Sequence, residues 1–421
     1  MMEIINLSDI NLPEYFNEQF FENLLKNINS YDEKKFQIIK LEFSRGSNDG
    51  ENYFSKILRV NIEYFCIGEK NEETNRIQNA YFIIKYLPND EKRPFGENLN
   101  FFCKEVDMTE NIIPKFEEIL NIKYILGPRH FYIKTDADRI IIFEDLKVSG
   151  YKLANREIGI DEEHGKLVLK KLGMFHAASL KLAQQDQNLM KLYDKGFFHE
   201  NNRNTTLQKN IFEGNLSCIA EAIKNWPGYE TISIKIQNLK EKFFDKCLAI
   251  EKTNDYELKV LNHGDLHLNN FMFQYDNNGK PNNVIFLDFQ MCHYASLGLD
   301  LNYFFNTSLQ INILKSKRNE LLKHYYNSLI ETLNKINFKP IPSMEDIERE
   351  VRNKEFFGFF AFEGILPTIS MHPEYCKKAN VDKFSTDEVL AWRRKVMFST
   401  DRYIETMRYS LKRFDSLGIL D

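Results

Sequence analysis

Residues 263–290 of this 421-residue chain read HGDLHLNNFMFQYDNNGKPNNVIFLDFQ. Two short apolar runs flank the turn residues Asn277-Asn278-Gly279, a pattern that predicts a hairpin of two short strands. A polar loop is expected at each outer end of this hairpin. Asp265 and Asn270 lie in the first loop, five residues apart, and Asp288 follows Asp265 by 23 residues, in the second loop.

These three side chains match the needs of phosphoryl transfer from ATP. That reaction requires a carboxylate to accept the hydroxyl proton, and a carboxylate with an amide oxygen to hold Mg²⁺ on the phosphates. Oxygen ligands suit Mg²⁺ and are poor ligands for zinc. Any one of the three could be an ordinary turn or buried residue, but the ordered set favours a site in which Asp265 is catalytic and Asn270 and Asp288 bind metal.

The rest of the chain changes character part-way along. The first third contains strand-like segments at 36–43, 54–65, 80–88, 131–134 and 139–146, a helical pattern that Pro13 opens, and a long helical pattern at about 98–120. Helical patterns then dominate, at 161–184, 205–225, 232–252, 316–335, 345–366 and 386–414. We therefore predict a small N-terminal lobe over 1–143, a hinge at 144–150 and a large, mainly helical lobe over 151–421.

A cation for the nucleotide phosphates is expected from the first lobe. Lys85 lies inside the apolar segment YFIIKYLP, where an unpaired ammonium group would be costly. Glu105, twenty residues later on the predicted long helix, is its expected partner, because a strand lysine paired with a helix glutamate is the arrangement that directs the lysine to the phosphates. The alternative is that Lys85 extends to solvent at the strand end.

Several segments together resemble one family. HGDLHLNN with FLDFQ is similar to the catalytic and metal-binding segments of kinase-like phosphotransferases, which include aminoglycoside phosphotransferases and choline kinase. The longer string from 263 to 305 resembles the ecdysteroid kinase-like family, as do the segments GENYFSKILRV, IIKYLP, IIFEDL and LGMFHAASL. The resemblance extends from about 35 to about 410.

The resemblance implies an α+β, protein-kinase-like two-lobe fold, with an antiparallel sheet and one long helix in the small lobe. It implies ATP and Mg²⁺ as cofactors, Asp265 as the catalytic base, and Asn270 and Asp288 as metal ligands. Lys85 would contact the α- and β-phosphates and pair with Glu105. Glu144, Asp145 and Leu146 would form the hinge, whose main chain meets the adenine.

The chain departs from the protein-kinase pattern in two places. RGSNDGEN at 45–52 stands where a G-x-G-x-x-G loop would be. Its glycines could let main-chain amides approach phosphate, and Ser55 could add a hydroxyl, although a plain hairpin turn explains the segment nearly as well. The metal segment Asp-Phe-Gln lacks the following glycine, and we find no Ala-Pro-Glu segment. Both absences argue against a protein substrate.

The amino-acid composition argues against several classes of binding partner. The net charge of −5 gives no basic surplus for nucleic acid, and the six cysteines include no C-x-x-C pair. The N-terminus does not resemble a signal peptide and no apolar stretch is long enough to span a membrane. We expect a cytoplasmic protein, favour a monomer, and expect a hydroxylated small molecule as its substrate, with no nucleic-acid or membrane partner.

Fewer sequence features bear on the molecule that accepts the phosphate than on the ATP site. The segment FFGFFAFEGIL at 356–366 could line an apolar pocket, although core packing explains it more simply. An aromatic lobe suits a lipophilic alcohol, and the resemblance implies an ecdysteroid or a related steroid or xenobiotic. The alternatives are a polar acceptor such as choline or an aminoglycoside, and a catalytically silent nucleotide-binding protein.

Four other polar residues are predicted to have structural roles. We expect His263 to brace the catalytic loop, His267 to be a structural loop histidine rather than a phosphate ligand, and His176 to be a satisfied core histidine. Asp300 is expected to tie the helix that follows Gly298 to the catalytic loop.

Overall fold

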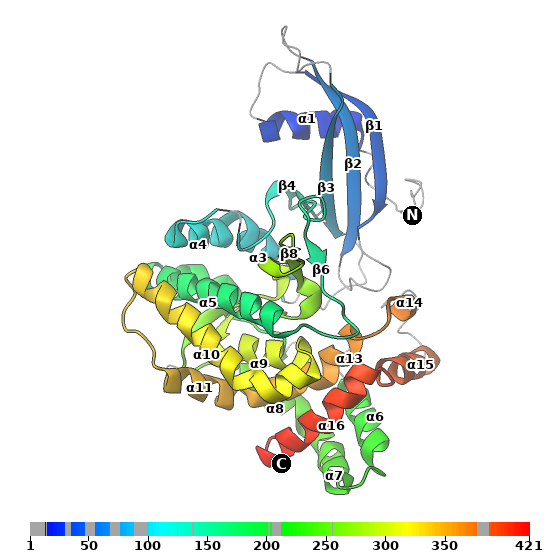
Figure 1. The fold of residues 1–421 in the computed structure, drawn as a ribbon, viewed down its shortest axis with the longest axis vertical. Coiled ribbons are helices and arrows are strands. Elements are labelled where there is room, and N and C mark those ends of the chain that lie inside the picture. The colour runs from blue at the N-terminus through cyan, green and yellow to red at the C-terminus, as the bar shows by residue number, and fades with distance from the viewer. Residues whose placement is uncertain are drawn as a thin grey trace. The chain divides into compact units, whose positions relative to one another are not determined.

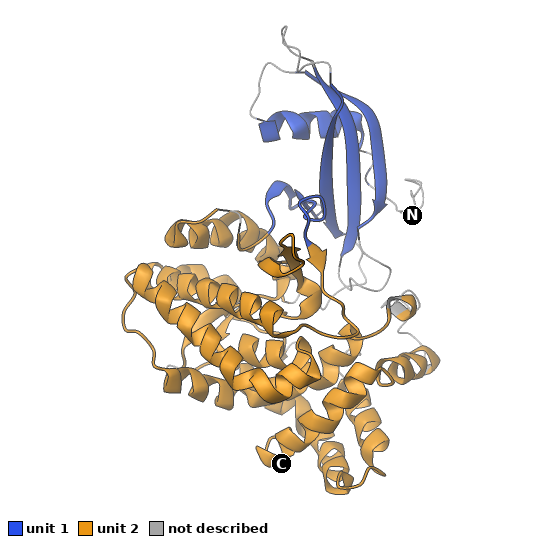
Figure 2. Cartoon of the chain, viewed as in Figure 1, with its two compact units in different colours: residues 1–93, 128–151, 376–381 blue, residues 94–127, 152–375, 382–421 orange. Residues whose placement is uncertain are grey.

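The computed structural model describes residues 13, 15–29, 35–46, 55–67, 76–87, 99–123, 125–136, 139–200, 203, 212–254, 256–376 and 387–421. The chain divides into two compact units (Figures 1 and 2). Unit 1 comprises Met1–Arg93, Pro128–Tyr151 and Cys376–Val381, and unit 2 comprises Pro94–Gly127, Lys152–Tyr375 and Asp382–Asp421.

Unit 1 is built on a five-stranded antiparallel sheet with strand order β1-β2-β3-β5-β4. Its strands are β1 Lys35–Arg45, β2 Lys56–Ile67, β3 Gln78–Leu87, β4 His130–Lys134 and β5 Arg139–Glu144. β-branched and aromatic residues dominate these segments, as expected of half-buried strands. Consecutive strands pair as antiparallel neighbours, except that β3 pairs with β5 and leaves β4 at the edge.

One face of this sheet carries the core of unit 1. Alternate residues of β2 and β3, such as Val60, Ile62 and Ile84, are fully buried in one cluster. Helix α1, Glu18–Asn29, contributes Phe21 to this cluster, and its ring packs edge-on against Phe43 of β1. Because side chains alternate between the two faces of a strand, the residues between these positions lie on the opposite face of the sheet.

Unit 2 begins with the predicted long helix. It consists of α3 Phe101–Asp107, a π-helical turn at Met108–Ile112 and α4 Ile113–Leu120. Phe116 of α4 packs edge-on against Phe175 of α5, with 5.0 Å between ring centroids. This contact anchors the helix in the large hydrophobic core of unit 2, which also includes Met108 and Ile112.

The remaining α-helices of the described residues follow in order. They are α5 Glu162–Gln185, α6 Gly214–Ile223, α7 Glu230–Leu239, α8 Phe243–Glu251, α9 Gly298–Thr307, α10 Ile311–Lys335, α11 Met344–Asn353, α12 Glu355–Phe360, α13 Leu366–Ile369, α14 Pro373–Cys376, α15 Asp387–Met397 and α16 Asp401–Ser416. A second π-helical turn, Ala361–Ile365, joins α12 to α13. The two longest helices, α5 and α10, pack along each other (Figure 1).

Two small sheets lie among these helices and position the candidate site. β6 Lys152–Leu153, β8 Phe271–Tyr275 and β9 Pro281–Phe286 form one, and β7 Lys259–Asn262 pairs with β10 His293–Ser296 in the other. The β8–β9 hairpin is the one predicted from the sequence. Its turn contains Gly279 at φ 76°, a left-handed conformation that glycine adopts without cost.

The predicted fold class is confirmed, with an antiparallel sheet in the N-terminal region and mainly helices in the C-terminal region. Residues 94–127 group with the helical unit, whereas we had placed them in the N-terminal lobe; the predicted lobe limits and the hinge stay predictions. The five phenylalanines of 356–366 are all buried, as core packing predicts. Within the described residues, no helix is both long and apolar enough to cross a membrane.

Candidate active site

The candidate site is a set of polar side chains at the ends of the two small sheets of unit 2. The loop after β7 carries Asp265 and leads into a short 3-10 turn, Leu268–Asn270, before β8 begins. Asp288 comes two residues after β9 ends. Strand pairing of β8 with β9 therefore brings the two predicted loops to the same end of one hairpin, as the sequence predicted.

The Asp265 carboxylate accepts hydrogen bonds from three side chains. Its Oδ1 atom accepts from the Tyr303 hydroxyl at 2.6 Å and lies 3.3 Å from Nε2 of His267. Its Oδ2 atom accepts from Nδ2 of Asn270 at 3.0 Å. The carboxylate is only 16% exposed. Its orientation is thus fixed from both sides.

These contacts decide the charge of Asp265. Burial alone would raise the pKa of its carboxyl group, but the attraction of His267 and the hydrogen bonds from His267 and Tyr303 outweigh it and hold the pKa well below its usual range. Asp265 is therefore a carboxylate and a weak base. A weak base suits a loose phosphoryl-transfer transition state, in which the acceptor hydroxyl loses its proton late.

Asn270 is oriented by the same loop. Its Nδ2 atom donates to both the main-chain oxygen of Asp265 at 2.9 Å and the carboxylate of Asp265. Because both neighbours are acceptors, the amide nitrogen must face them. The amide oxygen Oδ1 then points the other way and has the chemistry of a hard-cation ligand.

Asp288 has a left-handed main chain, with φ 65° and ψ 70°. Such a conformation is uncommon for a residue other than glycine and tends to persist at functional positions. The Asp288 carboxylate accepts from Nε2 of Gln290 at 3.2 Å. The residue before it, Leu287, donates its main-chain N–H to the main-chain oxygen of Asn270 at 2.9 Å. This bond holds the two predicted metal-binding segments together.

His263 links the same two segments. Its Nε2 atom lies 2.9 Å from the main-chain oxygen of Leu287, and its Nδ1 atom accepts from the main-chain N–H of Asp265 at 3.3 Å. These partners require the neutral tautomer with the proton on Nε2. Burial lowers the pKa of His263 despite the neighbouring carboxylates of Asp300 and Asp265, which agrees with a neutral ring. The predicted bracing role is confirmed.

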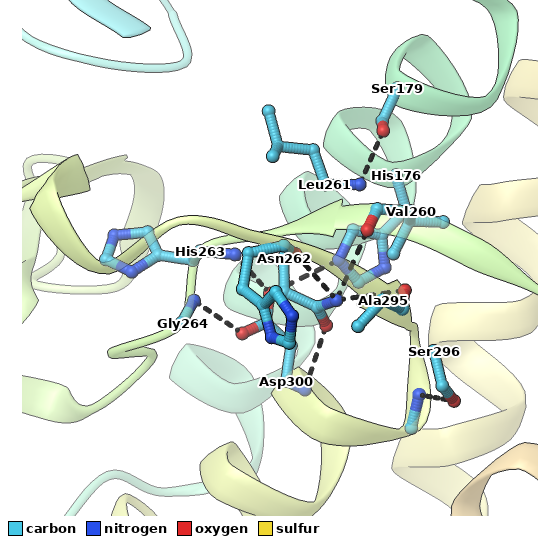
Figure 3. A network of polar contacts seen from close by, with 12 residues as sticks. His176, Ser179, Val260, Leu261, Asn262, His263, Gly264, Ala295, Ser296 and Asp300 are labelled. Atoms are coloured by element: carbon cyan, nitrogen blue, oxygen red, sulfur yellow. Dashed lines mark hydrogen bonds and ion pairs between the residues drawn. The ribbon is translucent and has the colours of Figure 1, made fainter. Parts of the chain in front are cut away.

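Asp300 of α9 holds the start of the catalytic loop (Figure 3). Its carboxylate accepts from the main-chain N–H groups of His263 at 2.7 Å and Gly264 at 3.0 Å. It also accepts from Nε2 of His176 at 3.3 Å. The other ring nitrogen of His176, Nδ1, lies 2.7 Å from the Tyr325 hydroxyl. The predictions for Asp300 and for His176 as a satisfied core histidine are both confirmed.

Asn262 is a further bracing residue, which the sequence did not single out. Its Nδ2 atom donates to the main-chain oxygens of His293 and Ala295, and its Oδ1 atom accepts from the main-chain N–H of Asp300 at 3.2 Å. It therefore joins β7, β10 and α9, as the dashed lines of Figure 3 show. Ser179 of α5 adds a fourth element, because its hydroxyl accepts from the main-chain N–H of Leu261 at 2.6 Å.

The residues predicted to bind the nucleotide lie partly in unit 1. Lys85 is buried on β3 and pairs in register with Ile57 of β2 and Ile141 of β5. It occupies the sheet face opposite the core, since its neighbours Ile84 and Tyr86 are core residues. Ser55 is half-buried just before β2. Of the predicted phosphate loop, residues 47–54 lie outside the described residues.

The predicted hinge residues follow β5. Glu144 ends the strand, and its side chain accepts from the main-chain N–H of Arg129 at 2.7 Å. Asp145 is buried in an ion pair with Arg59 of β2, in which Nη2 of Arg59 lies 3.3 Å from Oδ1 of Asp145. Leu146 is buried. The Asp145 side chain is thus engaged within unit 1, and the predicted adenine contacts of this segment stay a prediction.

Glu105 lies on α3 in unit 2 and is buried, with 2% of its surface exposed. Lys85 belongs to unit 1, so the predicted Lys85–Glu105 pair also stays a prediction. Within the part of the chain that is described, no group of three or more His, Cys, Asp or Glu side chains could hold a metal ion. A site made of Asn270 and Asp288 has only one such residue and would rely on phosphate oxygens for the rest, as Mg²⁺ sites commonly do.

Two functional candidates were missed by the sequence analysis. Tyr303 contacts the predicted catalytic carboxylate but lies in the apolar segment DLNYFF, where it looks like a core residue. Arg59 pairs with Asp145, which is 86 residues away in the sequence. The available signal for Arg59 was a charged residue between the apolar residues Leu58 and Val60 of a predicted strand, since burying it requires a partner.

Comparison with known families agrees with this geometry. A model of the ecdysteroid kinase-like family matches residues 49–338, which is more than half of the chain. The chain belongs to the ecdysteroid kinase-like family. The resemblance predicted from the sequence is confirmed, and Lys85, Asp265 and Asp288 all lie in the matched region. Membership of the ecdysteroid kinase-like family supports a small-molecule kinase with a kinase-like fold and implies the use of ATP.

A solved structure is similar to this chain only at low sequence identity. The solved structure of a microcompartment-associated aminopropanol kinase matches 96% of this chain and 99% of that chain, with 10% sequence identity and a TM-score of 0.39. A likeness at this level carries no argument about function. No curated protein matches this member of the ecdysteroid kinase-like family.

Proposed function

We propose that the protein transfers the γ-phosphate of ATP to a hydroxyl group of a lipophilic alcohol, such as an ecdysteroid or a related steroid or xenobiotic. The observation that supports a kinase most strongly is the fixed, anionic carboxylate of Asp265, held by Tyr303, His267 and Asn270. A carboxylate held in one orientation can align an acceptor hydroxyl and receive its proton.

The residues present fit a bound Mg²⁺ ion. Asn270 and Asp288 would hold it, since both offer oxygen atoms and the Asn270 amide nitrogen is engaged by Asp265. When bound, the ion would neutralise charge on the phosphate groups. The left-handed main chain of Asp288 and the bond from Leu287 to Asn270 keep these side chains at adjacent loop ends.

Lys85 is the proposed contact for the α- and β-phosphates, with Glu105 as its partner. Ser55 and the main chain of residues 144–146 are proposed to contact the phosphates and the adenine, respectively. Burial of Lys85 on the sheet face opposite the core agrees with this role, because a lysine there is shielded from bulk water and its charge is correspondingly effective.

A lipophilic acceptor is favoured by the aromatic side chains next to the catalytic carboxylate. The Tyr303 ring, whose hydroxyl bonds Asp265, lies 6.0 Å from the Phe357 ring and 6.4 Å from the Phe360 ring, centroid to centroid. Phe360 in turn stacks with the half-buried Phe197 at 5.6 Å. Phe357 and Phe360 are buried core residues, so they make the surroundings of Asp265 apolar without themselves lining a pocket. Apolar surroundings support an apolar acceptor over a polycation, which would need acidic neighbours.

The proposal is tested by measuring ATP consumption with Mg²⁺ against a panel of hydroxylated compounds that includes steroids, choline and aminoglycosides. We expect turnover that depends on a lipophilic acceptor and that falls by orders of magnitude in Asp265→Asn, with ATP affinity retained. Asp288→Ala should also lose Mg²⁺-dependent nucleotide binding. Turnover on choline or an aminoglycoside alone would overturn the acceptor class, and tight binding without any turnover would favour a silent nucleotide-binding protein.

We propose a cytoplasmic monomer that takes a hydroxylated small molecule and binds neither nucleic acid nor membranes. Its net charge of −5 supports the absence of a nucleic-acid partner.

A further inference from the structure

We propose that Tyr303 is a positioning residue for the phosphoryl transfer: its hydroxyl occupies Oδ1 of Asp265, so that Oδ2 is the oxygen that receives the proton of the acceptor hydroxyl. This inference rests on the proposed function and adds a named residue and a named atom to it. It starts from the 2.6 Å hydrogen bond that Tyr303 donates to Oδ1.

Helix α9 presents Tyr303 together with Asp300. The two residues are three positions apart, so their side chains leave the helix on the same face. Asp300 binds the main chain of the loop at His263 and Gly264, and Tyr303 binds the side chain of Asp265. One face of one helix therefore holds both the backbone of the loop and the carboxylate that it carries.

The acceptor capacity of the carboxylate assigns the two oxygens different tasks. A carboxylate offers about four lone-pair directions, two on each oxygen. Oδ1 has two neighbouring donors, the Tyr303 hydroxyl and Nε2 of His267, whereas Oδ2 has one, Nδ2 of Asn270. The direction that remains on Oδ2 is the one available to an acceptor hydroxyl.

Tyr303 is well suited to a fixed donor role. It is 1% exposed, and its ring is packed among Phe357 and Phe360. Burial and the charge of Asp265 raise the pKa of the Tyr303 hydroxyl, so this group keeps its proton and donates. Loss of the hydroxyl would leave Oδ1 with His267 as its one neighbouring donor, so the orientation of the Asp265 carboxylate would be less tightly fixed.

In the transfer step one P–O bond forms and another breaks. The acceptor oxygen forms a bond to the γ-phosphorus, and the bond between that phosphorus and the β–γ bridging oxygen breaks, its electron pair leaving with ADP. The acceptor hydroxyl proton passes to Oδ2 of Asp265 and then to solvent. Tyr303 keeps its own proton throughout, so it orients the base without exchanging a proton with the substrate.

The test compares the wild type with Tyr303→Phe, which removes the hydroxyl and keeps the ring. We expect kcat to fall at least about tenfold, since a positioned base commonly contributes 100-fold or more, with the KM for ATP changed less than about twofold. Tyr229→Phe is the matched control: that tyrosine is also buried, and its hydroxyl donates to the main-chain oxygen of Arg408, away from Asp265. Its kcat should stay within about twofold of wild type.

A rescue variant separates positioning from a general packing effect. 4-Aminophenylalanine incorporated at position 303 restores an N–H donor at the place of the hydroxyl, and we expect it to recover most of the lost kcat. This variant also answers the question if Tyr303→Phe proves too unstable to assay.

The outcomes are distinguishable. A folded Tyr303→Phe with wild-type kcat, or failure of the donor-bearing residue to restore activity, overturns the role of Tyr303 while leaving a kinase that depends on Asp265. A wild-type protein that transfers phosphate to no alcohol overturns the proposed function, and this inference with it.

Discussion

Oδ1 of Asp300 accepts a hydrogen bond from the main-chain N–H of Gly264 at 3.0 Å, so a side chain of α9 fixes the glycine that opens the catalytic loop. Oδ2 of the same carboxylate takes the N–H of the preceding residue, His263. Two successive main-chain donors are thus satisfied by one buried carboxylate.

Asp300→Asn should destabilise the protein and lower its activity. An amide has one acceptor oxygen in place of two, so at least one loop N–H loses its partner, and we expect the free energy of unfolding to fall by about 2–4 kcal/mol in urea titrations. Asp276→Asn is the control, because exposed Asp276 also accepts from two main-chain N–H groups, those of Asn278 and Lys280. Equal losses in both variants would contradict the bracing role.

Gly264→Ala should abolish activity through a steric clash. Gly264 has φ 83°, and a Cβ atom there would lie 2.0 Å from the main-chain oxygen of Met291. Gly279→Ala has the same left-handed strain, with φ 76°, but nothing lies within 4 Å of its Cβ position. We expect the control to cost about 1 kcal/mol and to keep its turnover. Comparable thermal unfolding and activity in both variants would show that the Met291 contact does not matter.

Breaking the Arg59–Asp145 ion pair should destabilise unit 1. Removing one partner leaves the other charge buried, at a cost of about 3–5 kcal/mol, so Asp145→Asn should shift the urea midpoint strongly. Nucleotide affinity should fall as well, because Asp145 lies in the proposed hinge. Glu331→Gln, which breaks an exposed pair with Lys335, should leave the urea midpoint close to that of the wild type. A double-mutant cycle at Arg59 and Asp145 with no coupling energy would refute the prediction.

Lys171 should make stability depend on pH. It is 5% exposed on α5, and its Nζ atom donates to the main-chain oxygen of Ile125 at 2.5 Å and to Oδ1 of Asn283 at 3.2 Å. Burial lowers its pKa to about 7, and the carboxylate of Glu117 only partly opposes this. Between about pH 7 and about pH 10 the unfolded chain therefore binds a proton that the folded protein does not.

The direction of the pH effect on stability follows from this difference in the number of bound protons. Stability rises with pH wherever the unfolded state binds more protons, by up to about 1.4 kcal/mol per pH unit for one group. The wild type should therefore gain stability relative to Lys171→Met as the pH rises above about 7, and the difference should be flat below that value. Lys170→Met, at the exposed neighbouring position, should show no such trend. Urea titrations at several pH values measure the free energy of unfolding of the wild type and both variants.

The sequence predicted the parts of this fold that depend on local pattern. Alternating apolar residues predicted the strands of unit 1. The spacing of Asp265, Asn270 and Asp288 around one hairpin predicted the catalytic and metal-binding loops. The position of Asp300, two residues after Gly298 at the start of a predicted helix, also led to the correct prediction that it ties that helix to the catalytic loop.

What the sequence did not predict depends on contacts between distant segments. The Tyr303 hydroxyl finds Asp265 only because α9 packs against the catalytic loop. A helix after Gly298 was predicted, but no local pattern placed its Tyr303 next to Asp265. Arg59 of β2 meets Asp145, which follows β5, across the intervening strand β3. The assignment of residues 94–127 to unit 2 likewise follows from the packing of Phe116 on Phe175, which no local pattern reveals.

The packing of residues 94–127 on unit 2 affects the order in which the nascent chain can fold. Once residues 1–151 have emerged from the ribosome, the strands of unit 1 are all available, but helix α3–α4 still lacks its partners in unit 2. Phe116 must wait for Phe175, and the end of α4 is fixed only when Lys171 reaches Ile125. We expect nascent chains of this length to expose an apolar helix and to be substrates for chaperones, while the sheet of unit 1 is already able to form.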